Sequence, residues 1–258
     1  MDFFDDLLNS STIPTQQISK MLEEDLFLQI IENSLQDSNN LQDQEMHLSQ
    51  ELENLVAEDI IGFQLRLEYY LFALHTAEVW CAACIMNDDT NTDHFFYFKN
   101  WIISQGKDLF EKAIVNPDDL ADYFEEGFNE DDLYEFDSFH LIANIAFNSK
   151  FEHNIIDFVD KDCFNFFTES AAKPEFDWDD ENLTNLQIIC PRLFKVFIED
   201  YSPDDDEMED DFDDEVDSNN IEREYTFENW ARAVKKYSSI LASDIYENGD
   251  YISLEKCR

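Results

Sequence analysis

The chain has 258 residues, of which 44% are hydrophobic and 24 are Phe, so it can bury a substantial core, and this composition argues against global disorder. Its 61 acidic and 16 basic residues give a net charge of -45, which disfavours direct binding to nucleic acid or to an anionic membrane. The scarcity of Gly (4) and Pro (5) favours long helices over sheets with tight turns.

The start of the chain and its cysteines indicate a compartment. Residues 1–18 are acidic and have no basic region, so we expect no signal peptide. No apolar run approaches the roughly 18 residues of a membrane span. The chain has five cysteines, an odd number, and it is longer than the small secreted domains that depend on disulfides. These features predict a cytoplasmic protein with reduced thiols.

Apolar residues recur at helical spacing through the first third of the chain. The pattern predicts helices over residues 18–36, 41–56, 57–74 and 77–86. The last of these is almost wholly apolar on the face that carries Trp80, Cys81, Cys84 and Ile85. We expect that face to lie at the centre of the core.

The most distinctive stretch of the chain spans residues 93–120. It contains four Phe and Trp residues within seven positions, namely Phe95, Phe96, Phe98 and Trp101. We expect an aromatic helix here, with Thr92 or Asp93 as its cap and with Gly106 as a kink or a close helix approach. A further helix is predicted over residues 107–115, and Pro117 should start another.

The second half of the chain is less regular. Residues 138–149 have the pattern of a helix, residues 155–172 fit either a helix or an irregular aromatic segment, and residues 174–181 form a loop that holds Trp178. Residues 183–197 are helix-like, although Pro191 requires a break or a new start.

An acidic run follows the predicted helices. Eleven of the fourteen residues from 204 to 217 are acidic, a composition that is typically disordered and solvated. Phe212 and Val216 interrupt the run, so it could also serve as an interaction peptide. The candidate partner-binding residues are Asp204, Asp205, Asp206, Glu207, Asp210, Asp211, Asp213 and Asp214.

These patterns predict an all-α fold, an irregular multi-helix bundle with a single main domain. Residues 1–18 form an N-terminal segment, residues 19–200 the helical domain, residues 201–220 an acidic, flexible, low-complexity segment, and residues 221–258 a C-terminal helical appendage. In the appendage, Thr226 can cap a helix that carries Phe227 and Trp230 on one side. Nothing in the sequence indicates an oligomeric state.

The central motifs resemble a known family. The residues that carry the resemblance are Trp80-Cys81-Ala82-Ala83, Asp93, Phe95, Phe98-Lys99, Trp101, Gln105-Gly106 and Pro117-Asp118. They are similar to the bacterial family named domain of unknown function 4240, over about residues 20–200. The family also occurs beside a WGR domain in molybdate metabolism regulators, which implies a regulatory role. The family usually has Arg at the position of Lys99, and an Arg guanidinium could donate two parallel hydrogen bonds to one carboxylate, which Lys cannot do.

Two clusters have the residue types of a metal site. Cys81 and Cys84 are spaced like a metal or redox pair, but no second closely spaced pair accompanies them, so small core residues are the favoured interpretation. The cluster of Asp88, Asp89, Asp93 and His94 could hold a divalent cation. In so acidic a chain, capping and solvation explain it better. We expect neither a metal nor a cofactor.

Four polar residues of the family-like motif are the remaining candidates: Asp93, Lys99, Gln105 and Asp118. They could line a polar pocket, with Lys99 paired to Asp93, or they could link helices through hydrogen bonds. No Gly-x-Ser-x-Gly, His-Glu-x-x-His or Gly-rich phosphate loop accompanies them. The five histidines stand singly.

Three hypotheses for the function remain. The first is an acidic protein-binding module that neutralises a basic protein partner, as an inhibitor or immunity protein does. The second is a regulatory or small-ligand-sensing domain, and the third is an enzyme of unrecognised type. The absence of a catalytic motif leans away from an enzyme. The acidity could also serve only solubility or adaptation to high salt.

Overall fold

The protein is described here by a computed structural model covering residues 12–36, 38–87, 90–124, 133–160 and 173–199. These residues are mostly helical and contain no strand, which confirms the predicted all-α multi-helix domain. One isolated parallel bridge joins Ile18 to Val159. The predicted acidic segment and C-terminal appendage lie outside the described residues.

The first four helices are α2 (Glu24–Gln36), α3 (Leu41–Glu53), α4 (Ala57–Ala73) and α5 (Ala77–Met86). Asn40 caps α3 by accepting from the Asp43 amide at 2.8 Å, and Thr76 caps α5 by accepting from the Val79 amide at 3.2 Å. Since α4 and α5 meet at 88°, the two helices form a sharp corner.

The predicted helix over residues 18–36 begins later than expected. The Leu22 amide donates to the Gly62 carbonyl at 2.9 Å, and Arg66 Nε donates to the Leu22 carbonyl at 2.9 Å. These bonds to α4 hold the preceding segment outside the helix, so α2 starts at Glu24. Gly62 allows the contact because a Cβ there would lie 2.8 Å from the Leu22 nitrogen.

The aromatic stretch forms α6 (Thr92–Ser104), followed by α7 (Lys107–Val115) and the 3-10 helix η1 (Pro117–Phe124). The cap of α6 is Asn91, whose side chain accepts from the Asp93 and His94 amides, so the predicted caps were wrong by one or two residues. Gly106 separates α6 from α7 with φ of 90°, a conformation that favours glycine.

The remaining described elements are shorter. They comprise η2 (Phe139–Leu141), α8 (Ile142–Phe151), η3 (Ile155–Asp157), α10 (Leu183–Ile189), α11 (Pro191–Phe194) and the π-helical turn η4 (Lys195–Glu199). Pro191 starts α11, where its missing amide hydrogen costs nothing. Of the two predicted outcomes at Pro191, a break or a new start, the structure has a new helix that begins there.

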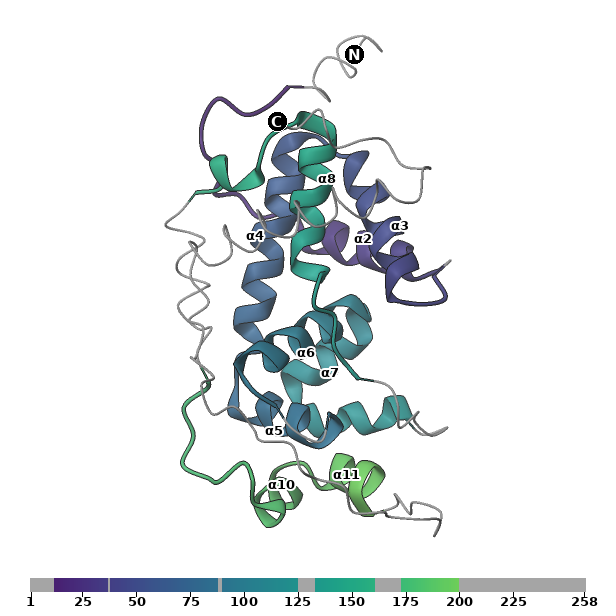
Figure 1. The fold of residues 1–258 in the computed structure, drawn as a ribbon, viewed down its shortest axis with the longest axis vertical. Helices are drawn as coiled ribbons and strands as arrows, with labels where there is room; N and C mark the ends of the chain where they lie inside the picture. Colours follow the sequence, from purple (N-terminus) through teal and green to yellow (C-terminus); the bar gives the residue numbers. More distant parts are fainter. Residues whose placement is uncertain (1–11, 37, 88–89, 125–132, 161–172, 200–258) are drawn as a thin grey trace, which may run out of the picture.

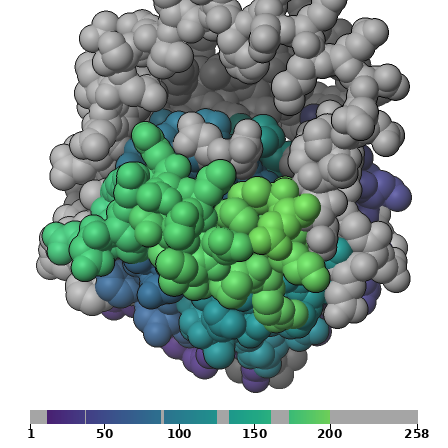
Figure 2. All heavy atoms as spheres, turned by 90° about the horizontal axis from the view of Figure 1, so that it is seen from below, coloured from purple at the N-terminus to yellow at the C-terminus, as the bar shows by residue number. Residues whose placement is uncertain are grey.

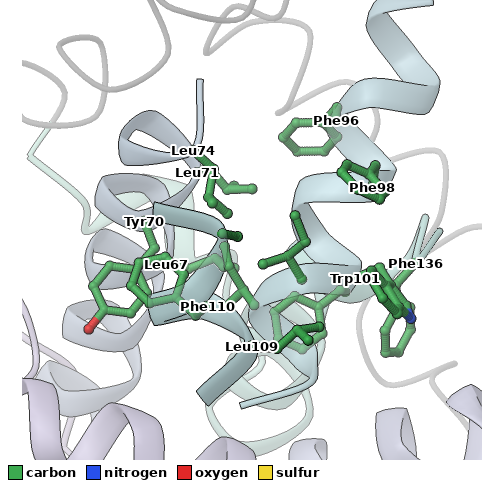
Figure 3. Packing of buried hydrophobic residues seen from close by; sticks show 14 of the residues in the cluster. Leu67, Tyr70, Leu71, Leu74, Phe96, Phe98, Trp101, Leu109, Phe110 and Phe136 are labelled. Atoms are coloured by element: carbon green, nitrogen blue, oxygen red, sulfur yellow. The ribbon is translucent and has the colours of Figure 1, made fainter. Parts of the chain in front are cut away.

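Figure 1 shows how these elements are arranged. Helices α2 and α3 pack beside α4 and α8 in the upper part, α5, α6 and α7 form the lower part, and α10 and α11 lie beneath them. Figure 3 shows Leu67 and Tyr70 of α4 beside Phe110 of α7, and Trp101 of α6 beside Phe136. Tyr70 and Phe110 stack with ring centroids 4.1 Å apart.

The four Phe and Trp residues of the central motif are all buried, and Phe98 is fully enclosed. Their burial explains why the motif is so dense, because α6 faces α4, α5 and η2 at once. Within the described parts of the chain, no single helix has the length and apolar composition to cross a membrane, and one bent pair, α4 with α5, meets those two criteria together.

Candidate functional site

Lys99 lies at the centre of a cluster of described residues whose pKa values are strongly shifted. It is on α6 and only 3% exposed. Its Nζ lies 4.7 Å from the ring centroid of Phe95 and 3.4 Å from Nδ1 of His75. Burial lowers the pKa of Lys99 to about 7, although the nearby Glu68 carboxyl acts in the opposite direction.

Glu68, on α4, is the acidic counterpart of Lys99. It is 2% exposed, and Gln64 Nε2 donates to its Oε1 at 2.8 Å. Burial raises the pKa of Glu68 to about 8, against the lowering effects of Gln64 and Lys99. Because no ion pair within 4 Å joins Glu68 to Lys99, their attraction acts over a longer distance. Both side chains are therefore shifted toward their neutral forms.

His75 closes this cluster at the corner between α4 and α5. Burial and the positive charge of Lys99 lower the pKa of His75 to about 3, so its ring is neutral at pH 7. A neutral Nδ1 can accept a hydrogen bond from the Lys99 ammonium. The buried polar cluster of Gln64, Glu68, His75 and Lys99 ties α4, α6 and the corner together.

The structure does not bring the four predicted motif residues together. Asp93 is exposed at the start of α6, and Gln105 accepts from the Tyr123 hydroxyl at 3.3 Å. Asp118 is buried, and its Oδ1 accepts from the Arg192 and Leu193 amides at 2.8 and 2.9 Å. No hydrogen bond or ion pair in the described residues joins any two of the four, so the predicted pairing of Asp93 with Lys99 was wrong.

The two candidate metal clusters have other surroundings. Cys81 and Cys84 are buried on α5, and the thiol of Cys190 lies against that of Cys81, a contact that together with burial raises the pKa of Cys190. His94 Nδ1 lies 2.7 Å from Glu135 Oε1. Asp88 and Asp89 lie outside the described residues. Within the described ranges, no group of three or more acidic, His or Cys side chains could hold a metal ion.

A surface feature lies beyond these helices, in residues 175–181, here called the acidic–aromatic segment. Exposed carboxylates alternate with partly buried rings: Glu175, Asp177, Asp179 and Glu181 are exposed, and Phe176 and Trp178 pack against the core. The two rings stack with centroids 4.2 Å apart. Figure 2 shows residues 173–199 as a continuous surface over one end of the molecule.

The family comparison bears on the buried polar cluster. Residues 22–149 match the model of the family described as Protein of unknown function (DUF4240). The chain belongs to this family. All residues of the buried polar cluster lie inside the DUF4240 match, whereas the acidic–aromatic segment and Pro191 lie beyond it. No curated protein and no solved structure matches the chain.

Sequence reasoning missed two features of this DUF4240 protein. Glu68 was not a candidate, although it lies seven residues after Ile61 and three before Leu71, both buried on the same helix face. The acidic–aromatic segment was predicted only as a loop. Its signal was the strict alternation of acidic and aromatic residues from Glu175 to Asp179.

Proposed function

We propose that this protein is an acidic binding module that engages a basic protein partner, and that the acidic–aromatic segment is part of the surface on which the partner docks. The observation that carries the proposal is the arrangement of exposed carboxylates around the stacked rings of Phe176 and Trp178. Aromatic residues at the centre of a patch and charged residues at its rim are typical of protein interfaces.

The distribution of basic side chains supports this proposal. Several of the described cations are already engaged by the chain itself. Lys112 pairs with Asp122, Lys150 Nζ donates to the Glu53 and Leu55 carbonyls, and Arg192 bridges Asp119 and Asp122. Lys99 is buried. The outward field is consequently dominated by carboxylates, which would attract a basic partner and speed its association.

The acidic run at residues 204–217 fits the same role. Its candidate residues, Asp204 to Asp214 as named above, would extend the negative surface offered to the partner. A module of this kind could neutralise the partner as an inhibitor or immunity protein does. The reduced thiols of Cys81 and Cys190 support a cytoplasmic location for it.

The test is affinity capture of partners from the native host with the full chain, in low salt, followed by elution in high salt and mass spectrometry. The proposal expects one basic protein in stoichiometric amount, because screening by salt weakens charge-driven association. A high-salt eluate without any basic protein would refute it. The control is the full chain with its acidic–aromatic carboxylates neutralised, which should capture less of that protein.

A further inference from the structure

A cation lies inside an aromatic cage beside the acidic–aromatic segment. The Nζ of Lys173 is 5.1 Å from the ring centroid of Trp80, 5.0 Å from that of Phe176 and 2.7 Å from Oδ2 of Asp180. An ammonium within about 6 Å of an aromatic ring is attracted by the negative face of the ring. Two rings and one carboxylate therefore converge on a single ammonium.

The cage is held together by contacts that do not involve Lys173. Trp80, on α5, is 2% exposed and packs against Phe95 with centroids 5.0 Å apart. Its Nε1 donates to Asp180 Oδ2 at 2.9 Å, which fixes the carboxylate. Phe176 stacks on Trp178. The cage is consequently preformed, and this lowers the entropic cost of binding a ligand there.

The carboxylate of Asp180 is kept ionised in this position. Burial opposes its ionisation, but the hydrogen bonds from Lys173 and Trp80 outweigh burial and lower the pKa of Asp180. To donate a hydrogen bond to the Asp180 carboxylate while it lies against the two rings, a cationic group must still carry an N–H. Lysine and its mono- and dimethylated forms meet this requirement, whereas a trimethylammonium group does not.

Lys173 itself is a weakly held occupant. Its side chain is 43% exposed, and the ion pair with Asp180 is therefore open to solvent on one side. Half-exposed ion pairs of this kind contribute little to stability. Rotation of the Lys173 side chain into solvent would free the cage for a second ammonium, at the edge of the proposed docking face.

We propose that Trp80, Phe176 and Asp180 form a recognition site for a lysine side chain of the basic partner, and that Lys173 fills this site in the free protein as an intramolecular substitute. This inference rests on the proposed function, because it names the residue type that the partner presents. It also gives Lys173 a regulatory effect, since an internal competitor lowers the apparent affinity of the site.

The experiment removes the internal competitor from the full chain. The variant Lys173→Ala is titrated with Nα-acetyl-lysine methylamide, and binding is followed through the indole N–H resonance of Trp80, which reports on its bond to Asp180. We expect Lys173→Ala to bind the probe several-fold more tightly than the wild type. The matched control is Lys107→Ala, which removes the same charge from a surface pair with Glu111 and should bind like the wild type.

Two further arms decide the chemistry of the site. The double variant Lys173→Ala/Asp180→Asn should lose the gained affinity, and the Nε-trimethyl form of the probe should bind Lys173→Ala at least ~10-fold more weakly than lysine. Equal binding of the probe by Lys173→Ala and wild type, or no effect of Asp180→Asn, would overturn the inference. If wild type still captures a basic protein in that case, the proposed function stands, whereas probe binding without any captured protein overturns the function alone.

Discussion

Glu68 on α4 and Lys99 on α6 are both more than nine-tenths buried, and each holds the other partly charged from beyond ion-pair distance. Burial is the larger influence on both, so each pKa lies several units from its ordinary value and near neutrality. His75 is kept neutral beside them. These shifted pKa values make the stability of the domain depend on pH, and substitutions can separate the contribution of each residue.

The variant Lys99→Met should make the protein progressively less stable than the wild type as pH rises above 7. A raised carboxyl pKa means that the folded state binds more protons, so stability falls with pH until the folded pKa of about 8, which would rise further without Lys99. The wild type also gains stability from pH 7 to 10.5, because folded Lys99 has lost its proton while unfolded Lys99 still holds one, and the variant loses this gain.

Urea unfolding at pH 5, 7 and 9 tests this expectation. The gap between wild type and Lys99→Met should widen by about 1.4 kcal/mol per pH unit above pH 7, where the variant lacks the Lys99 gain, and by about the same again above pH 8, where Glu68 of the variant stays protonated. The double variant Glu68→Gln/Lys99→Met should show neither effect, because it removes both the buried carboxyl and the buried amine. Parallel pH curves for wild type and Lys99→Met would contradict the account.

The half-buried His75 and the buried His140 predict a loss of stability in acid. Burial lowers the pKa of both His75 and His140 to about 3, while an unfolded histidine takes up a proton below about 6.5. The unfolded state therefore binds more protons between pH 6.5 and 3, and stability falls as pH falls through that window. His75→Gln and His140→Gln should each flatten the curve from pH 6.5 to 4. The exposed His153→Gln serves as the control, and equal slopes in all four proteins would refute the assignment.

Gly62→Ala should destabilise the protein by about 1–3 kcal/mol. Alanine in a helix ordinarily adds about 1 kcal/mol of stability relative to glycine. Here its Cβ would lie 2.8 Å from the Leu22 nitrogen and 3.1 Å from the Lys20 carbonyl oxygen, which are backbone atoms and cannot move cheaply. Chemical denaturation measures the difference. A stabilised variant would mean that residues 20–22 do not pack on α4 as described.

Asp118→Ala should cost about 1–3 kcal/mol, whereas Asp119→Ala should cost about 0–1 kcal/mol. The buried Asp118 accepts two amide hydrogens at the start of α11, and their loss leaves both donors unsatisfied. Asp119 makes only a half-exposed ion pair with Arg192. Urea unfolding of both variants, with hydrogen exchange over residues 183–199, provides the comparison. Equal effects of the two substitutions would contradict the capping role.

The sequence predicted the helices where local signals decide the structure. The bounds of α5 and α7 agree with the predicted ranges, because Thr76 and Gly106 mark their starts through capping and a positive φ. The start of α2 was missed because hydrogen bonds to Gly62 and from Arg66, both distant in sequence, override the local pattern. Such contacts leave no periodic signal in the segment that they hold.

The candidate site was harder to predict for the same reason. Lys99 was recognised from its motif. Its neighbour Glu68 lies on α4 and its neighbour His75 lies at the corner between α4 and α5, and only the packing of α4 against α6 brings them close to Lys99. Likewise, nothing local in residues 173–180 indicates that Trp80 completes a cage with them. Residue types can be read from a sequence, whereas their convergence depends on tertiary packing.

The most direct test of the proposed function is the ionic-strength dependence of association with the captured basic partner. The variant Glu175→Gln/Asp177→Asn/Asp179→Asn/Glu181→Gln neutralises the acidic–aromatic segment, and Glu23→Gln/Asp25→Asn/Glu32→Gln/Glu58→Gln removes the same charge from exposed positions elsewhere. Association rates are measured from low to physiological salt, where the Debye length falls to about 8 Å. The account predicts that the first variant loses at least ~10-fold in rate at low salt and most of the salt dependence, while the second stays near the wild type. Equal rates for the two variants would contradict the docking face and, with it, the central claim.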